Sequence, residues 1–314
     1  MQKRRLLSTW SHCYISTWRL SFSRVWSISK IKYYSSKMEE LQQENVIIGD
    51  KEKFEKKLKN LVTDGMDKLQ VIADFDGTLT KSIVDGKPAL HSIDVFKNTA
   101  TLSQAYRDGY NALAVKHGPA YENPNLSVEE RQEVLYRWWE DHENLCAGEV
   151  MTLNDLLQSN DNINTPLRDG CEKMLRLLSD HQVPLIVVSA GLGEVVKYVL
   201  KEYKPRVVSN YITFDDNGRI KEFSRPTVSV FNKHMFPLPV DQERHNVVLL
   251  GDSIGDCNMA DSVPDTKTVL KIGFFIGTDE KKLERYKSCY DLVLVEDQTM
   301  YTVTALLGRI AGRS

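Results

Sequence analysis

Acidic and hydroxyl side chains that could do chemistry together occur in three places, each directly after a run of apolar residues. Asp74 and Asp76 are two positions apart, Ser189 follows a second run, and a third run leads to Asp252 and Asp256. A carboxylate can act as a nucleophile, as a general acid or base, or as a ligand of a hard cation. One polar residue after one strand would mean little, but three groups with paired carboxylates indicate a catalytic site.

These residue types suit transfer of a phosphoryl group. An aspartate has a reference pKa of about 3.9 and is ionised at neutral pH, so Asp74 can attack phosphorus and form an aspartyl-phosphate. Asp76 can protonate the leaving oxygen and later deprotonate the attacking water. The hydroxyl of Ser189 and the amides of Ala190 and Gly191 can hold the phosphate where a strand meets a helix.

The carboxylates also indicate a metal ion. Asp74, Asp76 and Asp252 should converge in one crevice, with Asp256 nearby. Carboxyl groups a few ångströms apart do not all stay ionised unless a positive charge lies nearby. Ligation by oxygen alone, with room for water, fits Mg²⁺ better than Zn²⁺. The sequence therefore predicts Mg²⁺ as the cofactor.

Buried parallel strands must position these side chains. The apolar runs at 69–73, 185–188 and 247–250 are continuous and rich in β-branched residues, as in strands that are covered on both faces. A helix near 192–203 and a strand near 207–214 are predicted between the second and third runs. This alternation predicts an α/β fold with an open parallel sheet, in which ligands bind at the carboxyl ends of the strands.

A long insert follows the first of these strands. About 85 residues separate Thr80 from Thr165, too many for a loop in a compact domain. Apolar residues from 95 to 113 form one amphipathic stripe, and Ser127 with Glu130 forms a capping box that opens a helix. Another helix begins at 152–157. The insert is therefore predicted to be a helical domain.

Charge is distributed unevenly along the chain. Residues 1–37 contain eight Lys or Arg and no acidic residue, which leaves 33 basic and 43 acidic residues for the remainder. The chain after residue 37 is acidic enough to repel a nucleic-acid backbone, so we expect no nucleic-acid partner. It does not exclude a small anionic substrate, because one bound metal ion reverses the local field.

Residues 1–37 form a tail rather than a domain. They are rich in Ser and Arg, as mitochondrial transit peptides are, and a plain disordered extension is the alternative. No run of 18 apolar residues occurs, so no membrane-spanning helix is expected. The five cysteines are widely spaced without C-x-x-C, which indicates a reducing compartment. We expect a cytoplasmic protein, with mitochondrial targeting left open.

Several motifs resemble those of a known superfamily. D-F-D-G-T-L-T at 74–80, V-V-S-A-G at 187–191 and G-D-S-I-G-D at 251–256 resemble the motifs of the haloacid dehalogenase superfamily in order and spacing. Within it, F-N-K-H at 231–234 and D-L-V-L-V at 291–295 resemble the cytosolic 5′-nucleotidase III, or pyrimidine 5′-nucleotidase, family. The resemblance covers roughly residues 55–310.

The resemblance implies a fold and a division into domains. The core would be a Rossmann-like open parallel sheet made of residues 38–80 and 166–314, and residues 81–165 would be a helical cap that closes over the phosphate. One departure is Gly77, where this family is expected to carry Met. Glycine is common at this position in the wider superfamily.

The resemblance also implies roles for individual residues. Asp74 would be the nucleophile and Asp76 the acid and base, with Mg²⁺ on Asp74, the backbone oxygen of Asp76 and Asp252. The phosphate would be held and the site supported by a further set: Ser189, Ala190 and Lys233 on the phosphate, and Asp256 and Gly191 behind them.

Recognition of a base needs a flat apolar surface and hydrogen-bond partners at its edge. Trp138 and Trp139 point about 100° apart around a helix, so one packs and the other is a candidate platform. We name Trp139 as a supporting residue; two partly buried tryptophans at the domain junction are the alternative. Glu122 lies in a segment that resembles the family's base-recognising loop and would accept hydrogen bonds from an exocyclic amine, unless it is a solvated loop carboxylate.

We therefore predict a monomeric, Mg²⁺-dependent 5′-nucleotidase. Its substrates would be pyrimidine nucleoside monophosphates such as CMP and UMP, with 7-methyl-GMP as a further possibility. The alternatives are a phosphomonoesterase for a non-nucleotide such as phosphoserine, a nucleoside phosphotransferase, and an inactive binding module. The aromatic insert argues against phosphoserine, and the retained Asp74, Asp76, Asp252 and Lys233 argue against inactivity.

Overall fold

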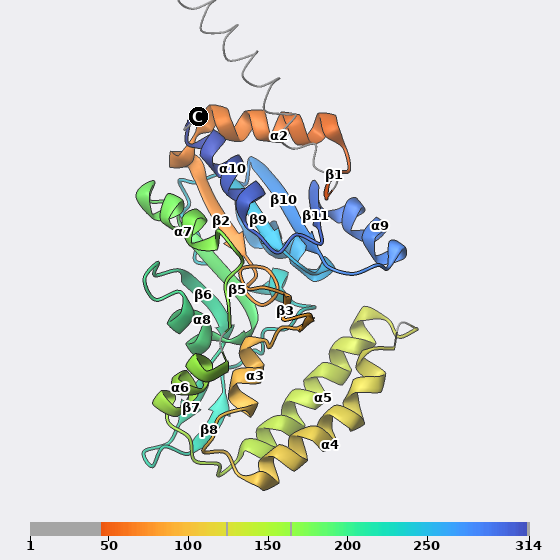
Figure 1. Cartoon of the computed structure of the whole chain (residues 1–314), viewed down its shortest axis with the longest axis vertical. Coiled ribbons are helices and arrows are strands. Elements are labelled where there is room, and N and C mark those ends of the chain that lie inside the picture. The colour runs from red at the N-terminus through yellow and green to blue at the C-terminus, as the bar shows by residue number, and fades with distance from the viewer. Residues whose placement is uncertain (1–44, 124, 164, 313–314) are drawn as a thin grey trace, which may run out of the picture. The chain divides into compact units, whose positions relative to one another are not determined.

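Seven strands form one sheet in the order β1-β11-β10-β9-β2-β5-β6 (Figure 1). All neighbours from β11 to β6 run parallel. The computed structural model describes residues 45–123, 125–163 and 165–312, so the tail predicted over residues 1–37 lies outside the described residues. The α/β fold with an open parallel sheet is confirmed.

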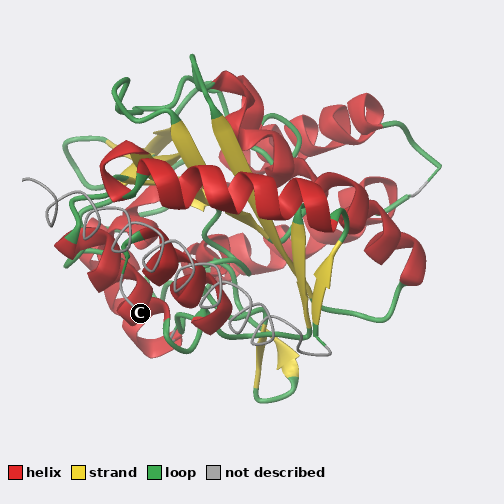
Figure 2. Ribbon diagram, turned by 90° about the horizontal axis from the view of Figure 1, so that it is seen from above, coloured by secondary structure: helices red, strands yellow, loops and turns green. Residues whose placement is uncertain are grey.

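The strands of this sheet come from distant parts of the chain. Every residue of β2 and β9 is buried, so both faces of these central strands are covered, and Figure 2 shows the helices gathered around them. The strands are β1 (Val46–Ile48), β2 (Leu69–Ala73), β5 (Leu185–Leu192), β6 (Arg206–Asn210), β9 (Asn246–Gly251), β10 (Thr268–Phe275) and β11 (Leu292–Val295).

Helices of the sheet-bearing part follow the expected pattern. The helix predicted before β2 is present: its N-cap Asp50 accepts a hydrogen bond from Lys53 N at 2.9 Å, and Phe54, Leu58 and Leu61 are buried. The helices are α2 (Lys51–Asp64), α7 (Cys171–Asp180), α8 (Gly193–Val199), α9 (Glu280–Cys289) and α10 (Tyr301–Ile310), with short 3₁₀ helices η2 (Met66–Lys68), η3 (Lys233–Met235) and η4 (Ile254–Ser262). Not one of the described helices combines the length and apolar content needed to cross a membrane.

The insert is helical, as predicted, with one difference. It holds the small hairpin β3 (Ile83–Val84) and β4 (Lys87–Pro88) and the helices α3 (Ser92–Lys97), α4 (Gln104–Tyr121), α5 (Val128–Cys146) and α6 (Leu153–Ile163). The single stripe predicted from 95 to 113 is divided between α3 and α4, because Asn98 ends one helix and Ser103 caps the next. Val95 and Tyr106 nevertheless share one core cluster. The capping box of Ser127 and Glu130 is present at the start of α5.

Two strand boundaries differ from those predicted. β5 continues through Leu192 instead of ending at Val188, although its register with β6 is irregular between these residues. The strand predicted over 207–214 is two strands, because the chain leaves the large sheet after Asn210. The Asn210 side chain donates to Ala190 O and Val228 O at 2.9 Å, and β7 (Ile212–Phe214) then pairs with β8 (Ile220–Phe223).

The chain enters and leaves the insert side by side. Thr80 and Leu167 form an antiparallel bridge, and Lys81 N donates to Pro166 O at 3.0 Å. Arg168 N donates to Leu79 O at 2.9 Å, which extends this pairing by one residue on each segment. The insert is therefore joined to the sheet through two paired backbone segments, residues 79–81 and 166–168. The first of these follows closely after Asp74 and Asp76.

Candidate active site

Neighbouring strands bring the predicted aspartates together. The sheet order places β9, β2 and β5 next to one another, so their carboxyl ends deliver Asp252, Asp74 and Ser189 to one edge. Asp74 continues the ladder, with its N–H donating to Leu250 O at 3.0 Å. Carboxylate oxygens of Asp74, Asp252 and Asp256 lie within 4.8 Å of one another.

Lys233 lies between two of these carboxylates. Its Nζ is 2.5 Å from Oδ1 of Asp74 and 2.8 Å from Oδ1 of Asp256, and the side chain is buried. Burial alone would lower the pKa of Lys233, but the charges of Asp256 and Asp74 outweigh it and raise the pKa. Lys233 is therefore a cation at neutral pH. Asn232 holds the lysine's loop, accepting from Ser229 N at 2.7 Å.

Asp256 is committed to hydrogen bonds within the protein. One oxygen accepts from Lys233, and the other accepts from the backbone N–H of Asp252 at 3.2 Å and from the N–H and hydroxyl of Ser253 at 2.9 and 2.8 Å. With both oxygens occupied, Asp256 is better suited to support the site than to bind a ligand.

The loop of Asp252 is held from several sides. Thr78 Oγ1 donates to Oδ1 of Asp252 at 3.1 Å, and the Tyr286 hydroxyl donates to its backbone oxygen. Gly77 has φ of 78°, and a Cβ there would lie 2.4 Å from Oδ2 of Asp252. The aspartate thus occupies space that glycine leaves free, which gives the departure at Gly77 a structural consequence in this chain.

Asp76 is bound by the first helix of the insert. Its Oδ1 accepts from Ser92 N at 2.7 Å and its Oδ2 from Ser92 Oγ at 2.6 Å. The Ser92 hydroxyl in turn accepts from Leu192 N at 3.2 Å. A Cβ on Gly191 would lie 1.7 Å from Ser92 Oγ and 2.8 Å from Asp76 Oδ2, so only glycine allows this close approach.

The predicted phosphate-holding residues lie at the end of β5. Ser189 is buried, and its Oγ accepts from Gly191 N at 3.0 Å. Ala190 is half-buried between them. Because the strand extends to Leu192, these residues belong to an irregular strand end rather than to a helix start, and α8 begins only at Gly193.

Burial and mutual repulsion shift the carboxylate pKa values upward. Burial raises the pKa of Asp74 to about 6, against the opposing charge of Lys233. Burial, with the charges of Asp74 and Asp256, raises the pKa of Asp252 well above its ordinary value. Burial also raises the pKa of Asp76, opposed by His91 and by the hydrogen bonds from Ser92. A cation beside Asp74 and Asp252 would remove this penalty.

The donor set fits a hard divalent cation. Asp74 and Asp252 offer oxygen ligands close together, and Asp256 lies within 4.8 Å of both. Oxygen donors favour magnesium or calcium over zinc. The ammonium group of Lys233 neutralises only part of the charge of three carboxylates.

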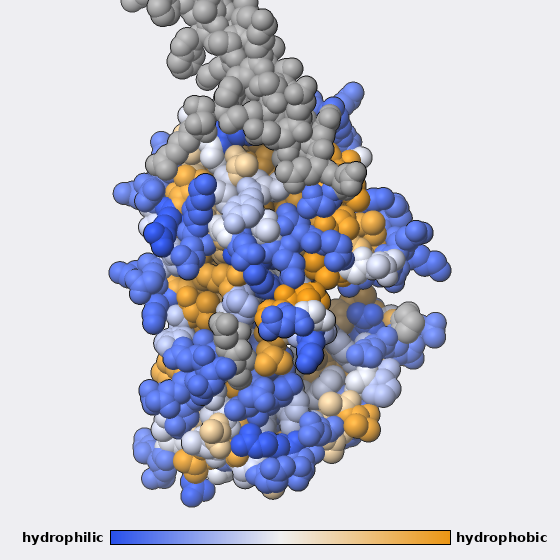
Figure 3. Space-filling view, viewed as in Figure 1, coloured by the Kyte–Doolittle hydropathy of each residue, from blue (hydrophilic) through white to orange (hydrophobic). Residues whose placement is uncertain are grey.

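Residues that were predicted to read a base lie on the α4–α5 hairpin. Glu122 is exposed and caps the C-terminus of α4. Trp139 is half-buried and packs against Phe223 with ring centroids 5.5 Å apart. Trp138 is also half-buried, and its ring is stacked on that of His117 at 5.9 Å. These contacts do not favour one tryptophan over the other as a platform for a base. On the face drawn in Figure 3, the surface is hollowed between the hairpin and the part that carries α9.

Several contacts link this hairpin to the loop of Lys233. The rings of Tyr121 and Phe231 are 6.1 Å apart, and the Arg131 guanidinium lies 5.1 Å from the Phe231 ring. Tyr136 OH accepts a hydrogen bond from Asn232 Nδ2 at 3.1 Å. The hairpin therefore contacts residues adjacent to the lysine.

Sequence reasoning missed several residues that shape the site. Thr78 lies inside a motif that was noticed, but it was given no role. Ser92, Arg168 and Tyr286 lie outside the motifs at 74–80, 187–191 and 251–256, and a single sequence marks none of them. Only the topology reveals that they contact Asp76, the turn at Gly77 and Asp252.

Comparison with known proteins gives consistent matches. A family model described as pyrimidine 5′-nucleotidase (UMPH-1) matches residues 77–311. The 7-methylguanosine phosphate-specific 5′-nucleotidases of Gallus gallus and Homo sapiens are each 32% identical, over 85% and 78% of this chain and 96% and 86% of theirs. The putative cytosolic 5′-nucleotidase 3 of Caenorhabditis elegans is 29% identical over 83% of this chain and 74% of its own.

Solved structures agree with these matches. The crystal structure of cytosolic 5′-nucleotidase IIIB bound to cytidine has a TM-score of 0.82 and 28% identity, over 88% of this chain and 97% of that chain. A probable phosphoserine phosphatase from Vibrio cholerae has a TM-score of 0.50 with 12% identity, over 79% of this chain and 67% of that one. The second match shows a shared fold alone.

Replacing Asp252 by Asn should stabilise the metal-free protein at neutral pH, because it removes one of three crowded carboxylates. A carboxyl group whose pKa is raised on folding contributes to the free energy of unfolding at low pH, where it is protonated. For the neighbouring Asp74 this contribution is lost as the pH rises from 3.8 to about 6, so above that pH the carboxylates are charged and repel one another. We expect a Tm in EDTA at pH 7.5 about 2–6 °C above wild type, with the difference shrinking toward pH 5.

Thermal melting in EDTA across this pH range measures the effect. Asp67→Asn, at an exposed aspartate of η2, is the matched control and should leave Tm unchanged. A Tm of Asp252→Asn below wild type at pH 7.5 would contradict the crowding described above.

Proposed function

Since the chain belongs to the pyrimidine 5′-nucleotidase family and is a 5′-nucleotidase, we propose that it releases phosphate from nucleoside 5′-monophosphates through a phosphorylated Asp74. The observation that carries this mechanism is the buried contact of Lys233 with both Asp74 and Asp256, beside Asp252. It supplies an oriented nucleophile and a fixed cation in one crevice.

In the first half-reaction, a carboxylate oxygen of Asp74 attacks phosphorus. The new bond joins this oxygen to phosphorus, the bond from phosphorus to the ribose 5′ oxygen breaks, and Asp76 donates a proton to that oxygen. The raised pKa of Asp76, caused by burial, favours the protonated acid that this step needs. Its two hydrogen bonds from Ser92 would keep the carboxyl group in place.

In the second half-reaction, Asp76 takes a proton from water, and the water oxygen attacks phosphorus. Phosphate leaves and Asp74 is restored as a carboxylate. Lys233, the Ser189 hydroxyl and the Ala190 amide would hold the outer phosphoryl oxygens through both steps. We propose that Gly191 and Asp256 support this set, because each makes hydrogen bonds to one of its members.

The cofactor that fits this site is Mg²⁺, held by Asp74, the backbone oxygen of Asp76 and Asp252. When bound, it neutralises the crowded carboxylates and stabilises charge on the transferring phosphoryl group. The donor chemistry and the raised pKa values of Asp74 and Asp252 support this assignment.

Residues 81–165 would serve as a cap over a core made of residues 38–80 and 166–314. Both connections of this insert lie beside the turn that follows Asp76. The contact between Tyr121 and Phe231 reaches the loop of Lys233, so closure of the hairpin would exclude water from the phosphate.

For the base, we propose cytosine and 7-methylguanine over uracil. Both carry an exocyclic amine that Glu122 could accept from, and uracil carries none. The positive charge of 7-methylguanine also strengthens stacking on an aromatic ring, for which we propose Trp139 or its neighbour Trp138. The names of the relatives support 7-methylguanine and the complex with cytidine supports cytosine, whereas the family description, pyrimidine, covers cytosine and uracil alike. We propose a monomer that acts in the cytosol, with import directed by residues 1–37 as the alternative; the name of the C. elegans relative supports the cytosolic location alone.

Replacing Asp74 by Asn should lower kcat for CMP by at least about 10³-fold, because the amide cannot form the phosphorylated intermediate. The release of inorganic phosphate from CMP measures kcat, and Asp67→Asn is the matched control. EDTA should likewise stop the wild-type reaction and Mg²⁺ restore it. Turnover by Asp74→Asn above about a tenth of wild type would rule out the covalent route.

Replacing Glu122 by Gln should raise KM for CMP and 7-methyl-GMP about 10-fold, because the amide oxygen accepts only a neutral hydrogen bond in place of the stronger one to a carboxylate. KM for p-nitrophenyl phosphate should not change. Glu140→Gln, in an exposed position on α5 of the same hairpin, is the matched control. Equal effects on nucleotides and on p-nitrophenyl phosphate would show that Glu122 does not read the base.

The same assay across CMP, UMP, 7-methyl-GMP and phosphoserine tests the substrate class. Phosphoserine hydrolysis faster than that of every nucleotide would favour the alternative phosphomonoesterase. Transfer of phosphate from CMP to added cytidine would identify a phosphotransferase, because the intermediate is then intercepted by an alcohol in place of water.

A further inference from the structure

Arg168 is a charged side chain that the reaction described above does not use. It is 1% exposed and is among the largest fully buried side chains of the described residues. Burying a guanidinium group is costly unless its donors are satisfied. Burial lowers the pKa of Arg168 to about 10, so it remains a cation at neutral pH. The protein therefore maintains a buried positive charge here at some expense.

The donors of Arg168 go to main-chain oxygens. Nε donates to Thr78 O at 2.7 Å, Nη2 donates to Gly77 O at 2.5 Å, and Nη1 donates to Asp297 O. The Phe274 ring lies 4.0 Å from the guanidinium carbon and covers one face of the group. A planar group with donors on three sides can hold several carbonyls in a fixed arrangement, and a lysine cannot.

Two of these carbonyls belong to the turn that carries the reacting aspartates. Gly77 and Thr78 directly follow Asp76, and Gly77 has a left-handed φ of 78°. The side chain of Thr78 donates to Asp252 at 3.1 Å, while its backbone oxygen accepts from Arg168. The same residue therefore contacts the site through its side chain and Arg168 through its backbone.

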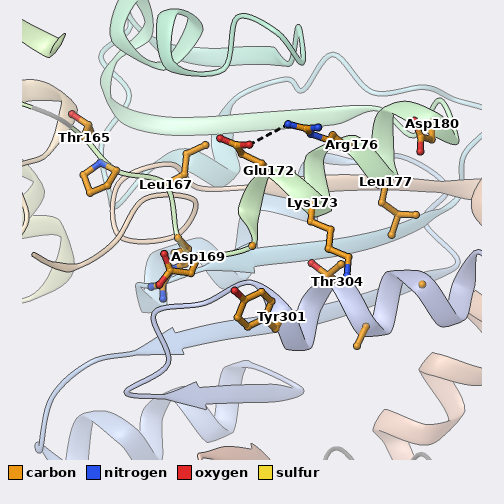
Figure 4. A pocket seen from close by; sticks show the side chains of 15 residues that line it. Thr165, Leu167, Asp169, Glu172, Lys173, Arg176, Leu177, Asp180, Tyr301 and Thr304 are labelled. Atoms are coloured by element: carbon orange, nitrogen blue, oxygen red, sulfur yellow. Dashed lines mark hydrogen bonds and ion pairs between the residues drawn. The ribbon is translucent and has the colours of Figure 1, made fainter.

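Arg168 also lies where the insert rejoins the sheet. Leu167 pairs with Thr80, and Asp169 pairs with Thr299. A pocket of about 1050 Å³ lies beside this segment, and Figure 4 shows Thr165, Leu167 and Asp169 along it, with α7 and α10 as its other walls. Backbone hydrogen bonds join this segment to Leu79 and Lys81, and the side chain of Arg168 adds the bonds that reach the turn itself at Gly77 and Thr78.

We propose that Arg168 is a positioning residue for the phosphatase reaction. It fixes the turn at Gly77 and Thr78, and through that turn it sets where Asp76 and Asp252 stand relative to Asp74. This inference rests on the proposed function, since it assigns a role in that same site. It predicts that loss of the guanidinium shape lowers the rate of the chemical step and leaves substrate affinity nearly unchanged.

Arg244 offers a matched control at the opposite end of the same strands. Its guanidinium donates to Met66 O at 2.7 Å, Leu69 O at 2.9 Å and Gln182 O at 3.0 Å. Leu69 begins β2 and Gln182 precedes β5, so these bonds lie at the amino ends of the strands. Both arginines thus fasten backbone segments, but only Arg168 does so beside the aspartates.

The experiment compares Arg168→Lys and Arg168→Gln with Arg244→Lys and Arg244→Gln in the full chain. Steady-state kinetics with CMP and Mg²⁺ and thermal melting are measured for each protein. We expect Arg168→Lys to lower kcat at least about 10-fold with KM changed less than about 3-fold, because small misplacements of reacting groups are costly. Arg244→Lys should lose a similar amount in Tm and keep wild-type kcat.

Each result decides the question. Equal kcat values for the two lysine variants, or a loss in kcat explained by the unfolded fraction, would overturn the proposal. If neither Arg168 variant folds while both Arg244 variants do, Arg168 is a requirement for folding and the proposal is overturned as well. Failure of the wild type to hydrolyse any nucleotide would instead count against the proposed function, so the two failures are distinguishable.

Discussion

The ammonium group of Lys233, buried between Asp74 and Asp256, is the interaction on which the site depends. Three carboxylates within 4.8 Å of one another would repel strongly in a dry crevice. The lysine compensates part of this charge, and the proposed metal ion would compensate the remainder. Its neighbours follow from this constraint, since Asn232 holds the lysine's loop and Ser253 holds the far oxygen of Asp256.

Side chains of the sheet-bearing part hold the loops of the site in place by hydrogen bonds to backbone carbonyls. Tyr286 and Tyr290 donate to the carbonyls of Asp252 and Ser253, and Asn210 donates to the carbonyl of Ala190. Such bonds fix loops at the carboxyl ends of strands, where regular ladder pairing has stopped. A parallel sheet supplies adjacent strand ends, but the accuracy of the site comes from these polar contacts behind it.

Local pattern explains which parts of this structure could be predicted from the sequence. Continuous apolar runs identify β2 and β9, and Ser127 with Glu130 marks the start of α5, because these signals act over a few residues. The end of β5 was placed too early, since Ser189 and Gly191 look like a helix start in sequence but are held in extended form by contacts with distant residues. The predicted roles of Asp74, Asp76 and Lys233 remain predictions, although the fold brings Asp74 and Lys233 together.

What the sequence could not reveal are residues that reach the site from outside its motifs, by hydrogen bonds to a carboxylate or to backbone carbonyls. Ser92 and Arg168 touch the site through bonds that no spacing rule describes, and each lies at one of the two connections of the insert. This placement has a mechanical consequence. Movement of the insert would act on Asp76 through Ser92 and on the turn at Gly77 through Arg168. If the insert is the cap that we propose, its position would therefore affect the geometry of the proposed acid and base, because Ser92 contacts Asp76 and Arg168 contacts the turn that follows it.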